Sequence, residues 1–372
     1  MKKKILVFHK GLAIYRVDFF NAVHEKYDAT FYFDNKKQGQ DTFNQFSRNY
    51  IESKCNFKSN YLLKGLKLFG RDFKWGITSI ILREKPDFVI CNEYTPVTIV
   101  VFINFLLSHK KFKFYTISDD SLENSMKRKG IRSTVRKILS KKIDGIIFPS
   151  NEVGNWYKNN VSARPKVLTL PIIHKDEVFR KELSNSLVLA NKYIKSYDLN
   201  GKKIILFVGR LIQLKNIEFL LNSVAQINQK NFQLVIVGNG ESMNSLKKKT
   251  LELQISDRVI FTDKKVGMEL LAWYVLAQIF VLPSTFEQFG AVVNEALLAG
   301  CNVLCSEVAG ASTLIRGNNG TLFNPLDQEQ LTQLLNKTLE KEAHIDNNIT
   351  TIRENKMPFK FNEIINNLFE KL

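Results

Sequence analysis

Cysteine is scarce in this chain of 372 residues, and the four cysteines that it has are scattered along the sequence. Cys301 and Cys305 lie four residues apart, but no second pair of cysteines and no histidine stands at the spacing of a metal site. A structural zinc site needs such a second pair. We therefore expect no metal site and interpret the cysteines as buried thiols of a protein in a reducing compartment.

Long hydrophobic runs are also missing. The longest, from Val97 to Leu107, contains Asn104 and is too short to span a bilayer. At the N-terminus only a few apolar residues separate Lys4 from His9, fewer than a secretory signal needs, so we expect a buried strand there. The sequence therefore predicts a cytoplasmic protein, peripheral at most on the inner face of the cell membrane.

No low-complexity segment and no internal repeat of 20–50 residues is apparent in the sequence. Apolar residues make up 44% of the chain and charged residues 24%, which is ordinary for a globular protein. A length of 372 residues exceeds what one hydrophobic core usually serves. We therefore expect two domains.

The net charge of +18 is distributed unevenly. Residues 1–170 hold 31 Lys and Arg against 15 Asp and Glu, whereas residues 171–372 hold 23 against 21. A generally lysine-rich surface would place the excess in both halves. The asymmetry favours a basic N-terminal face for an anionic partner: a membrane surface, a phosphorylated acceptor or a nucleic acid.

Short apolar runs alternate with amphipathic stretches through both halves, which is typical of βαβ units around a parallel sheet. In the first half the predicted strands are Lys4–Phe8, Ala29–Phe33, Phe88–Cys91, Lys113–Ile117, Gly145–Pro149 and Lys166–Leu170. In the second half they are Lys203–Val208, Gln233–Val237, Val259–Thr262, Ile279–Pro283, Asn302–Cys305 and a short edge at Thr321–Phe323.

The same pattern predicts the domain boundaries. We expect an α/β protein with a first doubly wound domain at 1–172, a linker region at 173–200 with one short helix near 187–197, and a second domain at 201–357. The tail 358–372 has apolar residues at helical spacing and should dock as a helix on the body. Open α/β sheets bind ligands at the carboxyl ends of their strands, so we expect the active site in the cleft between domains.

The segment from Pro283 to Gly300 carries the most suggestive chemistry. A strand ends at Pro283, a short loop carries Glu287, and Gly290 opens a helix that contains Glu295. Free N–H groups at a helix start attract phosphate, and carboxylates accept hydrogen bonds from sugar hydroxyls. The alternative is structural: Glu287 supports the first helical turn and Glu295 is a solvated helix residue.

This segment resembles the E-x7-E signature of glycosyltransferase family 4, with Glu287 and Glu295 at the two acidic positions. Neighbouring pieces resemble the family in the same order along residues 200–325. They are Val208–Leu211 followed by Lys215-Asn216, Val235–Gly240, Tyr274–Ser284 and Ala309-Gly310. The resemblance implies the GT-B architecture, with two Rossmann-like domains facing a central cleft.

The resemblance also implies roles for particular residues. Arg210 and Lys215 would hold the donor's diphosphate and stabilise the leaving nucleotide in place of a metal ion, whereas either residue alone reads as a surface cation. Glu295 would bind the ribose. Glu287 and the backbone of residues 289–292 would hold the transferred sugar and the phosphates. The full implied donor site comprises Gly11, Gly209, Arg210, Lys215, Glu287, Phe289, Gly290, Ala291, Val292 and Glu295.

Three places depart from the family or match it loosely. The loop that would contact the base is Asp263, Lys264, Lys265 and Val266, where the family commonly has a glycine. Where many members carry a histidine, this chain has Asp119 and Asp120, which either contact the sugar or acceptor or only cap a basic helix. After the first strand the family has a glycine-bearing loop that touches donor phosphate and acceptor, and Gly11 matches it only loosely. His9, at the end of that strand, is more often a packed histidine than a catalytic base.

Two stretches of the first half combine cations with apolar residues. The first runs from Lys54 to Trp75, and the second, Lys127 to Lys142, holds eight Lys and Arg. Such surfaces suit anionic lipid headgroups or the phosphates of a lipid-linked acceptor. A nucleic acid could use the same charge, but no recognisable nucleic-acid module accompanies it. We favour the membrane.

The resemblance implies a retaining, metal-independent glycosyltransferase without a cofactor. It would move a hexose-type sugar from a nucleotide sugar to a glycan acceptor, lipid-linked and destined for a surface polysaccharide. Two alternatives remain open. One is a sugar-nucleotide epimerase or phosphorylase of the same fold, and the other is a non-catalytic nucleotide-sugar-binding protein that docks on membranes.

Overall fold

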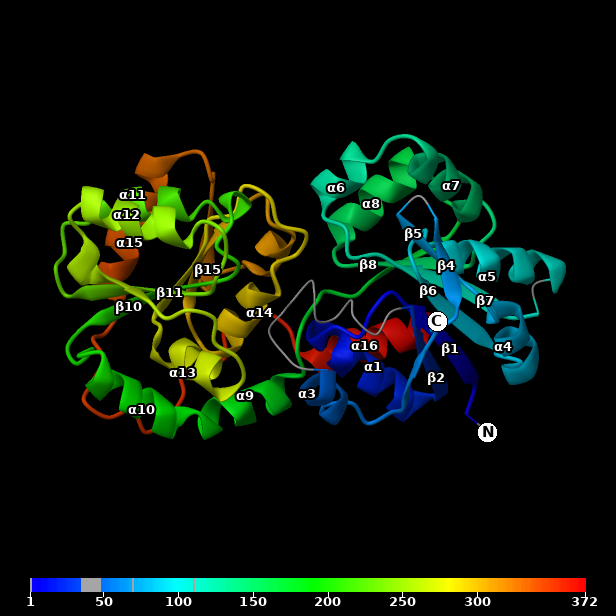
Figure 1. Ribbon diagram of the computed structural model, residues 1–372, viewed down its shortest axis with the longest axis horizontal. Coiled ribbons are helices and arrows are strands. Elements are labelled where there is room, and N and C mark those ends of the chain that lie inside the picture. Colours follow the sequence, from blue (N-terminus) through cyan, green and yellow to red (C-terminus); the bar gives the residue numbers. More distant parts are fainter. Residues whose placement is uncertain (1, 35–47, 69, 110) are drawn as a thin grey trace. The chain divides into compact units, whose positions relative to one another are not determined.

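The computed structural model describes residues 2–34, 48–68, 70–109 and 111–372. The chain divides into two compact units, residues 1–172 with 362–372, and residues 173–361 (Figure 1). In each unit helices flank a twisted parallel sheet. Within the described residues, no helix is both long enough and apolar enough to cross a membrane.

The first unit contains a seven-stranded sheet with the order β3-β2-β1-β6-β7-β8-β9, in which all neighbouring strands are parallel. Its strands are β1 (Lys4–His9), β2 (Asp28–Phe33), β3 (Ser59–Tyr61), β6 (Phe88–Asn92), β7 (Lys113–Ile117), β8 (Gly145–Phe148) and β9 (Lys166–Thr169). Its helices are α1 (Ile14–Lys26), α3 (Arg48–Ser53), α4 (Ile77–Glu84), α5 (Pro96–Leu107), α6 (Leu122–Lys127), α7 (Ile131–Ser140), α8 (Asn151–Asn160) and α16 (Phe361–Lys371).

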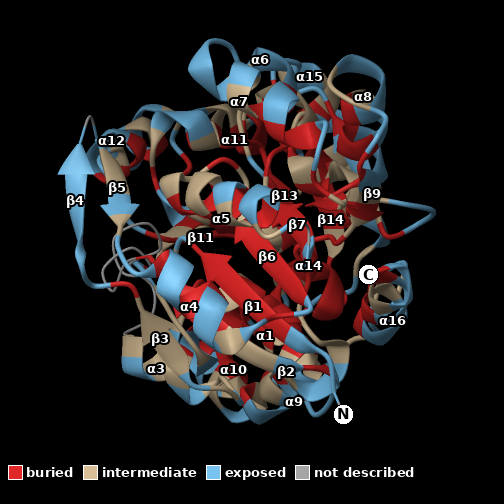
Figure 2. Cartoon of the chain, turned by 90° about the vertical axis from the view of Figure 1, so that its right-hand side faces the viewer, coloured by how far each residue is buried: buried red, intermediate tan, exposed pale blue. Residues whose placement is uncertain are grey.

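The central strands of this sheet are buried because helices cover both faces, which explains why they read as continuous apolar runs. Figure 2 shows β1 and β6 in red, whereas β4 (Gly65–Leu68) is pale blue. β4 and β5 (Arg71–Lys74) form a separate antiparallel ribbon that the sequence pattern did not predict as strands. The short strand β3 was not predicted either.

The second unit contains a six-stranded parallel sheet with the order β12-β11-β10-β13-β14-β15. Its strands are β10 (Lys203–Val208), β11 (Phe232–Val237), β12 (Val259–Phe261), β13 (Ile279–Leu282), β14 (Asn302–Ser306) and β15 (Gly320–Phe323), the last at an edge as predicted. Its helices are α9 (Asp176–Asn185), α10 (Leu187–Ser196), α11 (Ile217–Ala225), α12 (Met243–Glu252), α13 (Met268–Leu276), α14 (Ala291–Leu298) and α15 (Gln328–Lys341), with short 3-10 turns at Gln213–Lys215, Ser256–Arg258 and Gly310–Leu314.

Residues 173–200 differ from the predicted linker with one short helix. They form two helices, α9 and α10, that belong to the second unit and pack against α13. The ring of Tyr193 stacks on the buried Trp273, with ring centroids 4.8 Å apart. The segment was predicted as a linker because polar residues cover the outer faces of these helices, although their inner faces are apolar.

The C-terminal helix α16 packs on the first unit. Leu368 is buried, the ring of Phe369 meets the edge of Tyr27, and the Tyr115 hydroxyl donates a hydrogen bond to the Leu372 carbonyl at 3.0 Å. The final residues of the chain thus lie against β7. Helical spacing of apolar residues in the tail is the sequence feature that predicted this helix.

Candidate functional site

The second sheet reverses its winding direction between β10 and β13, which lie side by side although 70 residues separate them. Ligands of doubly wound sheets bind at the carboxyl ends of the strands beside such a switch point. Residues 209–216 leave β10 there, and residues 283–290 leave β13. The backbone N–H of Thr285 donates to the Leu214 carbonyl at 3.1 Å, which ties the two loops together.

Lys215 and Glu287 form an ion pair across these two loops. Their side chains are 15% and 17% exposed, so both are largely but not completely buried. Lys215 ends a 3-10 turn, and the next residue, Asn216, adopts a left-handed backbone (φ 54°) that its side chain secures by donating to the Pro325 carbonyl at 2.9 Å. The ammonium group is therefore held in place by the fold.

The loop that carries Glu287 is anchored on both sides. The Glu287 carbonyl accepts a hydrogen bond from Gly310 at 3.3 Å, and the Phe289 carbonyl accepts one from Ala311 at 2.6 Å. The Phe289 side chain is buried. These contacts fix the backbone that carries the Glu287 carboxylate. They also give the Ala309-Gly310 turn a structural role, because it holds the acidic segment.

Gly290 begins helix α14 in a left-handed conformation (φ 95°), which residues with a side chain rarely adopt. A Cβ atom added there would lie 3.2 Å from Cγ of Glu287. The N–H groups of Ala291 and Val292 in the first helical turn have no partner within the helix and carry its positive dipole end. This helix start can bind an anion beside Lys215.

Arg210 follows β10 and Gly209, and its side chain is exposed. Within the described part of the chain, its guanidinium makes no hydrogen bond or ion pair, so it is available to a ligand. Its loop rests on the turn at 238–240: Leu211 donates to the Asn239 carbonyl at 3.0 Å, and a Cβ atom at Gly238 would lie 1.8 Å from the Gly209 carbonyl oxygen. Gly238 therefore allows the close approach of these two backbone segments.

Glu295 lies on α14 and is 18% exposed. One carboxylate oxygen is 3.6 Å from Nε2 of His174, and Asn294 accepts a hydrogen bond from the His174 backbone at 2.9 Å. Burial and the nearby Glu295 carboxylate raise the pKa of Tyr274 well above its ordinary value. His174 belongs to none of the motifs in the sequence, and Tyr274 is only the first residue of the family-like piece Tyr274–Ser284, so neither was predicted as a site residue; the fold brings both to Glu295.

The loop predicted for base contact, residues 263–266, follows β12 at the edge of the sheet. Asp263 has a left-handed backbone (φ 56°), and its carbonyl accepts a hydrogen bond from Gly238 at 3.0 Å. The loop thus adjoins the glycine turn that supports Arg210. Lys265 lies near Glu269 at 3.5 Å on the surface. Base contact by this loop stays a prediction.

The predicted residues of the first unit lie at the carboxyl ends of β1 and β7. His9 is buried, and its Nδ1 lies 2.8 Å from the Gly11 carbonyl oxygen. Asp119 forms an ion pair with the buried Arg16 and accepts a hydrogen bond from Tyr15 at 3.4 Å. Burial would raise the pKa of Asp119, but Arg16, His9 and the two hydrogen bonds outweigh it and lower the pKa.

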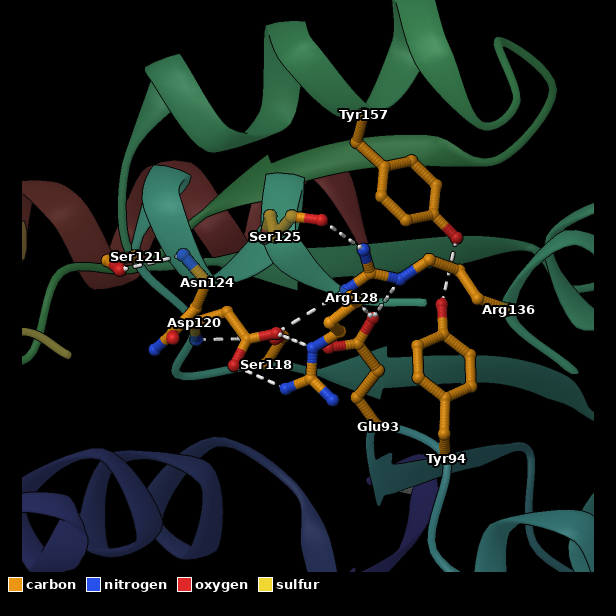
Figure 3. A network of polar contacts seen from close by, with 10 residues as sticks. All are labelled: Glu93, Tyr94, Ser118, Asp120, Ser121, Asn124, Ser125, Arg128, Arg136 and Tyr157. Carbon is orange, nitrogen blue, oxygen red and sulfur yellow. Dashed lines mark hydrogen bonds and ion pairs between the residues drawn. The ribbon is translucent and has the colours of Figure 1, made fainter. Parts of the chain in front are cut away.

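Asp120 belongs to a different network from its neighbour Asp119 (Figure 3). It is 3% exposed and accepts hydrogen bonds from Nε and Nη2 of Arg128. It also lies 3.4 Å from Arg136, which in turn binds Glu93 at 3.0 Å. Ser121 caps α6 by accepting a hydrogen bond from Asn124. We therefore revise the prediction for Asp120: it fixes the loop, and Asp119 is the one of the two that stays a candidate for contact with sugar or acceptor.

This network makes a stability prediction. Arg136→Met should lower the free energy of unfolding by about 3 kcal/mol, because it leaves the buried Glu93 carboxylate without its cation and removes one of the two arginines that contact Asp120. Arg132→Met, at an exposed position of the same helix, should change it by less than about 0.5 kcal/mol. Urea unfolding followed by circular dichroism measures both. Equal losses in the two variants would contradict the structural role of the network.

The buried His9 should make the stability of the protein depend on pH. Burial lowers the pKa of His9 from 6.5 to about 4, with Asp119 opposing and Arg16 reinforcing the shift. Below pH 6.5 the unfolded chain then binds a proton that the folded chain does not, so stability falls as the pH falls from 6.5 toward 4. Between about pH 7 and pH 5, the wild type should lose about 2 kcal/mol more than His9→Asn in urea unfolding. Parallel losses would refute the assigned pKa.

Comparison with solved structures identifies the class of fold. HepE from Anabaena, in complex with UDP-glucose, superposes with a TM-score of 0.71 over 99% of each chain, at 15% identity. The chain has the GT-B architecture, an α/β fold of two units with parallel sheets. This confirms the fold that the sequence predicted.

The family follows from the sequence of the second unit. The family model described as "Glycosyl transferases group 1" matches residues 191–355, the segment that holds Arg210, Lys215, Glu287 and Glu295. This match confirms the resemblance of the second unit to glycosyltransferase family 4.

Two curated proteins illustrate what the chain is similar to. An alpha-monoglucosyldiacylglycerol synthase of Streptococcus pneumoniae is 29% identical over 51% of this chain and 44% of its own length. The capsular polysaccharide biosynthesis glycosyltransferase CapM of Staphylococcus aureus is 24% identical over 73% of both chains. Seven of the curated relatives, the synthase included, are matched over only 29% to 44% of their own length.

Proposed function

We propose that this chain is a retaining glycosyltransferase that moves a sugar from a nucleotide-sugar donor to a glycan acceptor. The observation that carries the proposal is the grouping of Arg210, the Lys215–Glu287 ion pair and the start of α14 at the switch point of the second sheet. Two cations beside free helical N–H groups suit a diphosphate, and nearby carboxylates suit sugar hydroxyls. The match of residues 191–355 to the group 1 glycosyltransferases supports the same function.

In the proposed mechanism, Arg210 and Lys215 bind the donor's diphosphate. Their positive charge stabilises the negative charge that develops on the leaving nucleotide as the bond to the sugar breaks. Glu287 orients Lys215 and accepts hydrogen bonds from the transferred sugar. Glu295 accepts hydrogen bonds from the ribose. The acceptor hydroxyl would attack the face that the phosphate leaves and lose its proton to that phosphate, which retains the anomeric configuration.

The two cations also lead us to propose that transfer needs no metal ion, since they supply charge at the position where a metal would stabilise the leaving group. Activity that survives excess EDTA would support this part of the proposal. Activity that EDTA abolishes and magnesium restores would contradict it, without touching the assignment of the donor site.

For the acceptor we propose a lipid-linked glycan of a surface polysaccharide, used by an enzyme that is peripheral on the inner face of the cell membrane. The basic first half of the chain supports an anionic, membrane-borne acceptor. The similarity to a capsular polysaccharide glycosyltransferase over 73% of both chains favours the same class.

Turnover of a panel of radiolabelled nucleotide sugars, with membrane extract as the source of acceptor, tests the proposal. We expect one donor to be consumed, with label appearing in the lipid fraction and only when extract is present. If no donor is consumed, or if the sugar is released or isomerised without acceptor, the chain is not a transferase of this kind. Isomerisation or phosphate-dependent cleavage would instead identify an epimerase or a phosphorylase.

A further inference from the structure

The antiparallel ribbon β4–β5 places its side chains on two distinct faces. Leu66 lies opposite Phe73, and Leu68 opposite Arg71. The backbone N–H of Trp75 donates to the Lys64 carbonyl at 3.1 Å and so extends the same register. Because side chains alternate along a strand, one face carries Lys64, Leu66, Leu68, Arg71, Phe73 and Trp75. We refer to these six residues as the ribbon face.

The apolar residues of the ribbon face are open to solvent. The exposed fractions are 51% for Leu66, 45% for Leu68, 38% for Phe73 and 61% for Trp75. A contiguous group of large exposed apolar side chains marks an interaction surface. The ribbon belongs to neither parallel sheet, and two strands alone are only marginally stable, so this face does not serve as a core.

The charges on and around this face indicate what covers it. Lys64 and Arg71 stand on the face itself, and Lys67 is exposed on the neighbouring strand position. Residues 1–170 as a whole carry 31 Lys and Arg against 15 Asp and Glu. Apolar side chains flanked by cations fit the interface of an anionic bilayer, where the indole of a tryptophan prefers the level of the headgroups.

We propose that the ribbon face inserts shallowly into an anionic lipid bilayer. Leu66, Phe73 and Trp75 enter the boundary between headgroups and acyl chains, while Lys64 and Arg71 contact lipid phosphates. This inference rests on the membrane attachment included in the proposed function and names the element responsible for it. It does not require catalysis, so it can hold or fail independently of sugar transfer.

Trp75 provides a direct readout. The chain has three tryptophans; Trp273 is fully buried and Trp156 half-buried, whereas Trp75 is the exposed one. With vesicles of equal parts phosphatidylcholine and phosphatidylglycerol, the emission of the wild type should shift to shorter wavelength. Vesicles of phosphatidylcholine alone should give a much smaller shift. Trp75→Phe should remove the shift and still sediment with the anionic vesicles.

Two double variants then separate the apolar and the charged contributions. Leu66→Ser with Phe73→Ser, and Lys64→Gln with Arg71→Gln, should each sediment with anionic vesicles at least about tenfold more weakly than the wild type. The matched control, Leu251→Ser with Lys248→Gln, changes an exposed leucine and an exposed lysine of α12 in the second unit and should bind normally. Unchanged circular dichroism and melting temperature establish that the variants fold.

Several results would overturn the inference. If the protein sediments with vesicles while the Trp75 emission stays constant, another surface binds the lipid, and α7 with its exposed Ile131, Lys137 and Ile138 is then the alternative. If the ribbon variants bind vesicles as the wild type does, the ribbon is not the docking element. If they instead change the size of the protein in gel filtration, the ribbon face is a protein interface. None of these measurements uses a sugar donor.

Discussion

Lys215→Ala is expected to lower the rate of sugar transfer, kcat, about 100- to 1,000-fold, a loss comparable to removing one group that stabilises charge in a transition state. The ammonium of Lys215 is fixed by its 3-10 turn and by Glu287, so it is already positioned when the leaving phosphate gains charge. A preorganised cation of this kind contributes more to the transition state than to the bound donor. KM for the donor should therefore change less than kcat.

Lys248→Ala is the control for this prediction, because that lysine is 78% exposed on α12 of the same unit and only weakly paired. It should transfer sugar at the normal rate. The Lys215 variant should keep the melting temperature of the wild type within a few degrees, since its side chain is not part of the core. Near-normal kcat in Lys215→Ala would remove Lys215 from the diphosphate site.

Glu295→Gln is expected to raise KM for the nucleotide sugar about 10- to 100-fold, because hydrogen bonds to a carboxylate are worth roughly 1.5–3 kcal/mol. A carboxylate accepts bonds from two neighbouring hydroxyls, whereas an amide offers one acceptor and adds donors of its own. The effect should fall on KM more than on kcat, since ribose is bound alike before and during transfer.

A donor that lacks the 2′-hydroxyl of the ribose tests the proposed role of Glu295 more directly. The wild type should discriminate strongly against a 2′-deoxyribose donor, and Glu295→Gln should discriminate much less, because the group that reads the hydroxyl has gone. Glu252→Gln, at an exposed position of α12, is the matched control and should behave as the wild type. Equal discrimination by wild type and Glu295→Gln would show that Glu295 does not read the ribose.

Much of the fold could be predicted from the sequence because parallel strands covered on both faces are continuous apolar runs. Lys113–Ile117 and Lys203–Val208 are observed with the predicted bounds. The ribbon β4–β5 could not be predicted in this way, since its apolar residues face solvent and its cations interrupt them. It was recognised only as a basic stretch with apolar residues.

The candidate site, like the fold, could be predicted from the sequence only in part. The motifs named Arg210, Lys215, Glu287 and Glu295, but the approach of Lys215 to Glu287 depends on the sheet order, which no local pattern determines. His174 reaches Glu295 from the start of the second unit, where the sequence offers no signal. Asp119 and Asp120 are neighbours in the sequence but pair with different arginines. Asp119 pairs with Arg16, whereas Asp120 pairs with Arg128 and Arg136, and no local pattern predicts these contacts.

Calorimetric titration of nucleoside diphosphates into the protein, with EDTA present, tests the central claim most directly. The claim is that Arg210, Lys215 and the start of α14 hold the diphosphate of a nucleotide sugar. Among UDP, GDP, ADP, CDP and TDP, at least one should bind, the corresponding nucleoside should bind far more weakly, and Lys215→Ala should lose most of the affinity that the phosphates provide. Equal binding of the nucleoside and its diphosphate, or full affinity in Lys215→Ala, would contradict the account.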